Sequence, residues 1–377
     1  PPRSTLFPYT TLFRSKYLVG DDGVLGERND YKCLSVEHKL GLHASPTCVI
    51  SYGEAGDGAV GYLIGEEHQG MRYMFKMMNN ARLGVGVEGL AVAEGALQHA
   101  AAFALERRQG RAVGAPAGEQ SPIVDHPDVR RMLLTMRAYT DAMRCVLYAN
   151  SSALDVAKRH PDPETRQAAS DRAELLTPIS KAWCTDLGVE LTSIGIQVHG
   201  GYGYIEETGA AQYLRDSRIS PIYEGTNGIQ ALDLVGRKLP LREGGVVGDL
   251  LAEIGSLDAS LAEAGAGFES IRANLADAQA ATGEATRWLM ANGAGDPTDA
   301  MAGATPYLRM LGQLVGGWLL ARLALGAHGR LADGGDDEFL ASKIVVARFY
   351  AEQLLPLARA QMGDRKSTRL NSSHVKR

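Results

Sequence analysis

The sequence has little of what several protein classes require. Its only four cysteines are scattered, with no CxxC pair and no metal-site spacing: Cys33, Cys48, Cys145 and Cys184. Such thiols favour a reducing, cytoplasmic location over a disulfide framework. No apolar run reaches the roughly 18 residues that a membrane-spanning helix requires. The histidines show no HExxH-like spacing, so we predict no metal.

Positive charge is also scarce. The 39 Lys and Arg residues are outnumbered by 44 Asp and Glu residues, which gives a net charge of −5. Because nucleic-acid-binding domains carry clustered Lys and Arg, we predict no nucleic-acid partner. Hydrophobic residues make up 45% of the 377 positions. That is enough for a sizeable core, and the length allows more than one domain.

Both ends of the chain differ in composition from the rest. The first residue is Pro rather than Met, and residues 1–15 include RSTLFPYTTLFRS, which reads nearly the same in both directions. Residues 364–377, DRKSTRLNSSHVKR, are a polar, basic tail after an alanine-rich segment. We interpret both ends as foreign, adaptor-derived segments. The alternative is that they are natural disordered termini.

The pattern between the ends predicts a mainly α protein with a small β part. Residues 16–71 contain short strand-like runs such as YKCLSV and TCVISY, and we interpret them as the second half of a β domain, a partial β-barrel. Residues 72–239 read as long helices joined by short loops, which is typical of an antiparallel four-helix bundle. LREGGVVGD is the predicted linker to an appended helical domain at 247–363.

Glycine and proline set the expected helix limits. A first helix covers 72–108, and its several glycines indicate close approach of another helix or a ligand. A second follows and ends at HPDPE. Thr177 and Pro178 fit the start of a third helix, which ends at the Gly200–Gly201 pair. A fourth runs from Thr226 to about Leu239.

The stretch PIYEGTNGIQ, residues 221–230, contains the carboxylate of greatest interest. Glu224 is either a solvated loop acid before a helix, stabilised by the helix dipole, or a general base. Tyr223 brings apolar surface beside it, and Gly225 allows a ligand to approach the backbone. A carboxylate desolvated in such a place acts as a base because burial disfavours its charged form.

Two further stretches have both a structural and a functional interpretation. QVHGGYG, residues 197–203, is either a helix C-terminus or a set of backbone N–H groups for a phosphate. ERRQGR, residues 106–111, is either a solvated helix end or a phosphate or ribose contact. We interpret His199 as a packing or hydrogen-bonding residue, and Glu206 and Glu207 as surface acids.

Taken together, these motifs resemble the acyl-CoA dehydrogenase family. The matching stretches follow the family's order and spacing over residues 16–239, and the combination of IYEGT with an upstream QxxGGxG is highly specific. They are EHKLGLHASPTCVISY, GYLIGEEHQGM, NNARLGVG, FALERRQG, QVHGGYGYIEE and YLRDSRISPIYEGTNGIQ. The C-terminal helical extension resembles that of longer members, including the branch of 3-methylmercaptopropionyl-CoA dehydrogenases.

The resemblance implies an FAD enzyme acting on a fatty acyl-CoA thioester. A carboxylate removes the α-proton while the β-hydrogen leaves as hydride to flavin N5, and the IYEGT motif assigns that carboxylate to Glu224. Other branches place the base immediately before the arginine of NNARLG, but Ala81 stands there. The resemblance also implies electron transfer to an electron-transfer flavoprotein and a homodimer or homotetramer. It further implies that an N-terminal helical domain and the first half of the β domain are missing.

The resemblance assigns roles to further residues. The backbone N–H of Glu224 would help bind the thioester oxygen. The ERRQG stretch departs from the family pattern at Gly110, where an aromatic residue is common. The predicted FAD contacts are Arg107, Gln197, Gly200, Gly201, Thr226 and Gly228, and the predicted substrate contacts are Asn79, Arg82, Tyr223 and Gly225.

Two alternatives remain open. One is a flavoprotein of the same fold with a binding role and no dehydrogenase activity; the intact IYEGT motif argues against it. The other is an acyl-CoA oxidase, which differs in how the reduced flavin meets oxygen. An affinity for DNA without acyl-CoA turnover would favour the binding role, which is that of the DNA-alkylation-response members of this fold. Peroxide production would favour the oxidase.

Overall fold

The computed structural model describes residues 12–13, 16–54, 56, 58–293, 297–334 and 337–363. The segments predicted to be foreign, 1–15 and 364–377, lie outside these residues except for positions 12 and 13. The chain divides into two compact units, Pro1–Ala81 and Arg82–Arg377, which we describe separately. The division falls within the first helix rather than at its predicted start.

The described part of the first unit contains short strands and the beginning of a helix. The strands pair as three antiparallel two-stranded sheets, β1 with β6, β2 with β3, and β4 with β5. The longest pair joins the predicted strands YKCLSV and TCVISY, in a register from Tyr31 opposite Tyr52 to Val36 opposite Cys48. The strands are β1 (Leu12–Phe13), β2 (Tyr17–Val19), β3 (Leu25–Arg28), β4 (Tyr31–Val36), β5 (Cys48–Tyr52) and β6 (Tyr62–Leu63).

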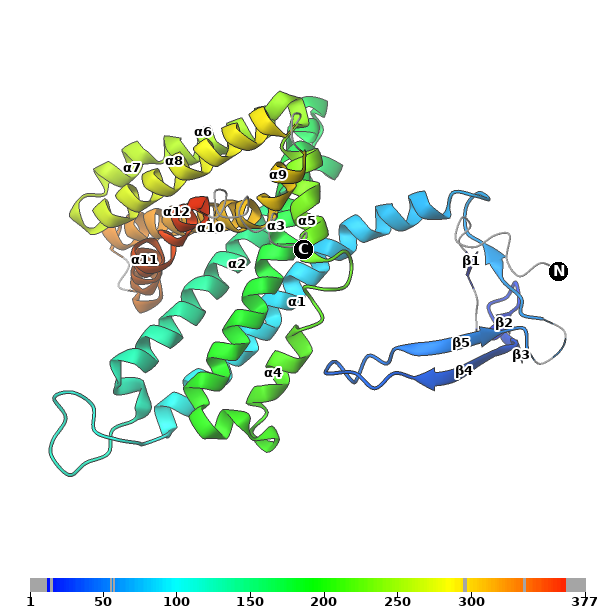
Figure 1. The fold of residues 1–377 in the computed structure, drawn as a ribbon, viewed down its shortest axis with the longest axis horizontal. Helices are drawn as coiled ribbons and strands as arrows, with labels where there is room; N and C mark the ends of the chain where they lie inside the picture. Colours follow the sequence, from blue (N-terminus) through cyan, green and yellow to red (C-terminus); the bar gives the residue numbers. More distant parts are fainter. Residues whose placement is uncertain are drawn as a thin grey trace, which may run out of the picture. The chain divides into compact units, whose positions relative to one another are not determined.

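Three long helices organise the second unit. Helix α1 (Gly70–Glu106) enters from the first unit, and α2 (Pro127–Arg159) and α3 (Pro163–His199) follow as an antiparallel pair (Figure 1). Two short helices, α4 (Ala210–Ser217) and α5 (Asn227–Asp233), complete the predicted bundle region. Thr226 caps α5 as predicted, because its hydroxyl accepts a hydrogen bond from the Ile229 N–H at 3.3 Å.

The start of α3 differs from the prediction. Thr177 and Pro178 do not begin the helix; it begins at Pro163, and the carboxylate of Asp162 caps it. Pro178 lies buried inside the helix. Proline removes one backbone hydrogen bond there, but the surrounding apolar residues are buried, and their packing outweighs the local preference. The predicted end is confirmed, because Gly200 caps the helix with a φ of 60°.

The helix glycines allow α1 and α3 to touch backbone to backbone, as predicted. A Cβ at Gly89 would lie 2.8 Å from the Cys184 carbonyl oxygen, and one at Gly86 would collide with the Ser180 carbonyl. On the other helix, a Cβ at Gly188 would lie 3.0 Å from the Gly89 carbonyl. The loss of helix propensity at these glycines is offset by this close packing.

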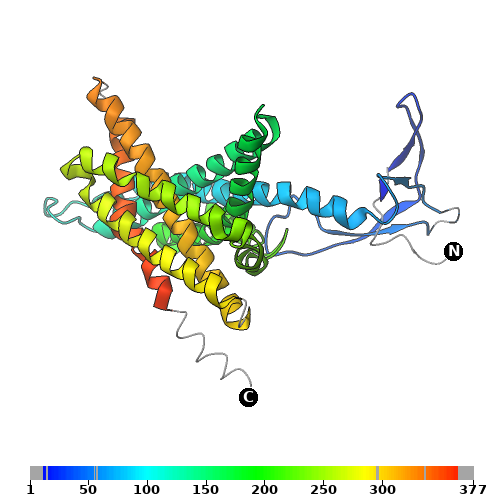
Figure 2. The ribbon, with the colours of Figure 1, turned by 90° about the horizontal axis from the view of Figure 1, so that it is seen from above.

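The C-terminal helices share the core of the bundle. Helix α10 packs against α2 and α3 as well as against α8 and α11, and Figure 2 shows the group from a second side. The Tyr139 ring meets Trp183 at 6.3 Å and Tyr350 at 5.7 Å, both edge-on. These helices are α6 (Gly245–Ser256), α7 (Asp258–Glu263), α8 (Glu269–Asn292), α9 (Pro297–Ala302), α10 (Ala304–Ala332), α11 (Glu338–Phe349) and α12 (Leu357–Ala360).

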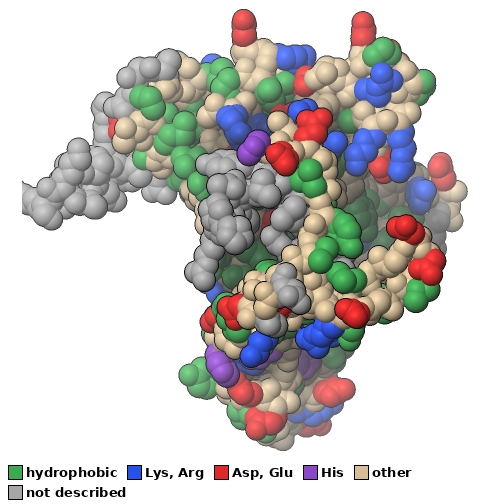
Figure 3. Space-filling view, turned by 90° about the vertical axis from the view of Figure 1, so that its right-hand side faces the viewer, with side chains coloured by type: hydrophobic (Ala, Val, Ile, Leu, Met, Phe, Trp, Pro, Cys, Tyr) green, Lys and Arg blue, Asp and Glu red, His purple; other side chains and the backbone are tan. Residues whose placement is uncertain are grey.

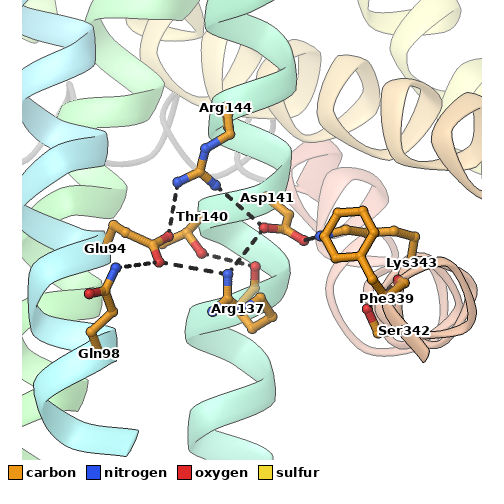
Figure 4. A network of polar contacts seen from close by, with 9 residues as sticks. All are labelled: Glu94, Gln98, Arg137, Thr140, Asp141, Arg144, Phe339, Ser342 and Lys343. Atoms are coloured by element: carbon orange, nitrogen blue, oxygen red, sulfur yellow. Dashed lines mark hydrogen bonds and ion pairs between the residues drawn. The ribbon is translucent and has the colours of Figure 1, made fainter. Parts of the chain in front are cut away.

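A charged network joins α1, α2 and α11 (Figure 4). Asp141, which is 5% exposed, pairs with Lys343 at 2.9 Å and with Arg137 and Arg144 at 3.5 Å each. Arg144 also pairs with Glu94 at 3.1 Å. The pair of Asp141 and Lys343 is largely buried, and removing one partner of a buried pair typically destabilises a protein by about 3–5 kcal/mol. The network therefore fixes the appended helices to the bundle.

Helix α10 is the one described helix that is long and apolar enough to cross a membrane. It was not expected from the sequence, where polar residues such as Gln313 interrupt the apolar run. Within the protein, 72% of the most apolar stretch of α10 is buried, and Gln313 donates a hydrogen bond to the Leu354 carbonyl at 2.8 Å.

The surface charge is mixed. On the face of the molecule drawn in Figure 3, Lys and Arg side chains are interspersed with Asp and Glu side chains.

Candidate active site

The IYEGT motif forms a tight loop before α5. Its two ends are joined by a hydrogen bond from the Asn227 N–H to the Pro221 carbonyl at 3.0 Å. Inside it, Glu224 and Gly225 have φ values of +55° and +85°. Glycine adopts that region freely, but a side-chain-bearing residue there costs about 1–3 kcal/mol. The strained residue of this loop is therefore the carboxylate predicted to be the base.

Glu224 is half-buried between a tyrosine and a glycine with defined positions. The Tyr223 hydroxyl donates a hydrogen bond to the Glu88 carboxylate on α1. Burial, and then the Glu88 carboxylate, raise the pKa of Tyr223 far above its usual range. The Gly225 carbonyl accepts a bond from the Gln230 amide at 3.4 Å. Within the described residues, the Glu224 N–H donates to no protein acceptor, so it is available to a ligand.

Arg82 lies against this loop. It is 6% exposed, and its Nη1 is 3.4 Å from Oδ2 of Asp233. A Cβ added at Gly225 would lie 3.7 Å from Nη2 of Arg82, so the two residues are neighbours. The structure therefore brings together Arg82, Tyr223, Glu224 and Gly225 from the predicted set. The Asn79 side chain lies outside what the structure describes.

A buried polar network beneath the loop was not predicted. The Asn227 amide donates to Oδ1 of Asp186 at 2.7 Å and to the Thr185 hydroxyl at 2.9 Å. Its oxygen accepts from Lys181 Nζ at 2.8 Å. Burial lowers the pKa of Lys181 to about 8 and raises that of Asp186. The signal available in the sequence was a lysine and an aspartate within the apolar helix ISKAWCTDLG.

Three of the predicted cofactor residues, Arg107, Gly200 and Gly201, lie together at the far end of α3. A cavity of about 620 Å³ is lined by Arg107, Gly200, Gly201, Phe103 and Tyr202, among others. The Arg107 guanidinium lies 5.2 Å from the centroid of the Tyr202 ring. No atom lies within 4 Å of a Cβ added at either glycine, so their backbone is open to a ligand. Such an arrangement of cation, aromatic faces and free backbone suits a nucleotide.

The remaining predicted contacts lie apart from this cavity lining. Gln197 is exposed on the last turns of α3, and Thr226 and Gly228 are exposed at the start of α5. His199 is buried, and its Nδ1 donates to the Gly195 carbonyl at 2.7 Å. Burial lowers the pKa of His199, and its ring packs 4.5 Å from Phe103. The predicted packing and hydrogen-bonding role of His199 is thereby confirmed.

The part of the chain that the structure describes contains no candidate metal site. Within those residues, no three side chains of His, Cys, Asp or Glu type are grouped so as to hold an ion. The chemistry available to the site is therefore that of a strained carboxylate, a free amide N–H, a buried cation and a nucleotide-sized cavity.

The sequence models of two protein families match the chain. Residues 68–239 match "Acyl-CoA dehydrogenase, C-terminal domain", and residues 250–369 match "Acetyl-CoA dehydrogenase C-terminal like". The 3-methylmercaptopropionyl-CoA dehydrogenase of Ruegeria pomeroyi is 48% identical over 341 residues, which is 90% of this chain and 57% of that protein. A butyryl-CoA dehydrogenase of Syntrophomonas wolfei is 33% identical over 352 residues, again 90% and 57%. The chain thus spans little more than half the length of these relatives.

A solved structure shares the fold. The acyl-CoA dehydrogenase of Bacillus anthracis complexed with FAD superposes with a TM-score of 0.71 over 95% of this chain and 60% of that one, at 20% identity. This likeness extends through the C-terminal helices, and it confirms a mainly helical fold of this type. The predicted division into domains stays a prediction.

Proposed function

The chain belongs to the acyl-CoA dehydrogenase family, and on that premise we propose that it carries the catalytic base of an FAD-dependent acyl-CoA dehydrogenase. The base is Glu224, which removes the α-proton of an acyl-CoA thioester. The observation that carries this proposal is the position of Glu224 in a strained loop, half-buried, with Arg82 behind the loop. Backbone strain of this kind clusters at functional sites.

The loop offers a second group to the reaction. Removal of the α-proton places negative charge on the thioester oxygen, which needs a hydrogen-bond donor. The Glu224 N–H is available for this role, and Gly225 leaves room for a carbonyl to approach. Base and donor then belong to the same residue, so one backbone conformation sets both. Tyr223, held by Glu88, forms part of the acyl-site wall.

The cavity near the Gly200–Gly201 pair fits a nucleotide cofactor. Its volume of about 620 Å³ lies within the range of small-molecule sites, and Arg107 supplies a cation for a diphosphate. Gly200 and Gly201 supply open backbone, and Phe103 and Tyr202 supply aromatic faces. FAD, when bound, supplies the acceptor for the β-hydrogen as hydride. Thr226 and Gly228 are proposed as further contacts at the start of α5.

We propose that the electrons pass to an electron-transfer flavoprotein and that the enzyme is a cytoplasmic homodimer or homotetramer. We propose that Gln197, which is exposed and does not line the cavity of its own chain, contacts the cofactor of a neighbouring copy. Light scattering tests the oligomer. Comparing electron-transfer flavoprotein reduction with peroxide release distinguishes a dehydrogenase from an oxidase. We expect the first and little of the second.

The proposal is tested by Glu224→Gln in a chain extended to the length of its curated relatives. Turnover of acyl-CoA should fall by about 10²–10⁴-fold, because general-base catalysis contributes that much, while FAD absorbance per protein stays constant. Glu207→Gln, a change of an exposed glutamate, is the matched control and should keep full activity. Turnover of Glu224→Gln at the control rate would show that the base lies elsewhere.

A further inference from the structure

The loop that carries Glu224 is fixed to α3 through one side chain. Asn227 stands at the loop's end, and its amide binds Lys181, Thr185 and Asp186, all within a turn and a half of α3. Its own N–H closes the loop. A strained loop keeps its conformation only where its surroundings over-determine it, and here Asn227 provides that constraint.

The burial of Lys181 carries a free-energy cost. Its side chain is fully buried, and an ammonium out of water is strongly penalised. A methionine of similar length would fill the space without that penalty. A charge retained despite its cost indicates a function beyond packing.

The charged groups that face Lys181 come from each neighbouring element. Arg82 and Glu88 lie on α1, Asp186 on α3, and Glu224 on the loop. The positive charge of Arg82 is offset by its ion pair with Asp233, itself bound by Arg237 at 2.5 Å. Lys181 forms no ion pair within 4 Å among the described residues.

We propose that Lys181 is a positioning residue for Glu224: through its hydrogen bond to Asn227 it holds the loop against α3. The inference rests on the proposed role of Glu224. A general base has to meet the substrate α-proton at a set position. A loop that moved away from α3 would therefore slow the chemical step more than it weakened substrate binding.

The first test uses Lys181→Met in the extended chain. The kcat should fall about 10- to 100-fold with KM changed less than about twofold, because a displaced base affects the chemical step. Lys343→Met, which removes a mostly buried lysine from the Asp141 network, is the control and should keep its kcat. Equal kcat in the two variants overturns the positioning role of Lys181.

The second test uses Asn227→Ala in the extended chain, and it also serves if Lys181→Met fails to fold. The kcat should fall about 10- to 100-fold with KM changed less than about twofold, because misplacement of the base affects the chemical step. Asn150→Ala, which removes a buried asparagine that bridges α2 to Ser180 at 2.9 Å, is the matched control. Equal kcat in the two variants overturns the positioning role.

The outcomes separate this inference from the proposed function. Full turnover by Glu224→Gln contradicts the proposed function, whatever Lys181 does. Loss of turnover in Glu224→Gln, together with an unchanged kcat in the Lys181 and Asn227 variants, leaves the function standing and rejects the inference. Loss of turnover in Glu224→Gln with a lowered kcat in the other two variants supports both.

Discussion

The hydroxyl of Tyr223 donates a hydrogen bond to the carboxylate of Glu88, and this contact joins the loop of the proposed base to helix α1. The loop is thus held from two directions, by Glu88 on one helix and by the Asn227 network on the other. Burial and the Glu88 carboxylate raise the pKa of Tyr223, so its hydroxyl stays a hydrogen-bond donor well above the neutral range.

Replacing Tyr223 by Phe should lower the free energy of unfolding by about 1–2 kcal/mol, because the Glu88 carboxylate loses a donor while partly buried. Urea denaturation at pH 7 measures the change. Tyr204→Phe is the control, since Tyr204 is 90% exposed and should give a difference near zero. Equal midpoints for the two variants would mean that the hydrogen bond has no net effect.

Gly225→Ala should be more damaging than its size suggests. Alanine at a φ of +85° is strained by about 1–2 kcal/mol, and its Cβ would lie 2.8 Å from the Gln230 amide nitrogen. We expect lower thermal stability and a loss of acyl-CoA turnover. Gly248→Ala, at an open helix position, should instead stabilise by about 0.5–1 kcal/mol. A stabilising Gly225→Ala would contradict the loop conformation.

Arg107→Met should weaken binding of ADP, used as the diphosphate half of FAD, by about tenfold, because one charge-assisted contact is lost. Isothermal titration calorimetry on the present chain provides the measurement. The neighbouring exposed Arg108, whose guanidinium donates to the Gln120 carbonyl at 2.9 Å, provides the control as Arg108→Met. Equal weakening by both would indicate a general charge effect instead of a contact in the cavity.

Because of Lys181, the free energy of unfolding should rise with pH above about pH 8. Its pKa is about 8 in the folded protein and 10.5 in the unfolded chain. The unfolded state therefore binds more protons between these values, and the free energy of unfolding rises with pH across this window, by up to about 3 kcal/mol. The difference between wild type and Lys181→Met, followed by urea midpoints from pH 7 to 10.5, should show this rise. A flat difference would refute it.

Much of the site was predictable because its signals are local. A glycine after Glu224 and a threonine before a helical pattern are readable within PIYEGTNGIQ, and the structure places Arg82 beside them. Lys181 and Asp186 were not predictable in the same way. Their burial depends on α1 and α5, which come from distant parts of the sequence.

The incorrect start of α3 has a similar origin. Thr177-Pro178 and Asp162-Pro163 both carry the local pattern of a helix start, and only the latter is used. The choice depends on the burial of the residues on both sides of Pro178 in a core to which α2 and α10 contribute. Both dipeptides place a capping residue before a proline, so the local sequence alone cannot show which one starts the helix when tertiary packing decides.

The packing of Trp183 against α10 makes the bundle and the C-terminal helices depend on each other. A Cβ at Gly312 would lie 2.5 Å from Trp183 Cγ, so the indole depends on glycine at that position. Trp183 stands two residues after Lys181 on the same helix. Loss of the C-terminal helices would uncover the Trp183 indole, which is 1% exposed, so the bundle cannot keep its present core without them.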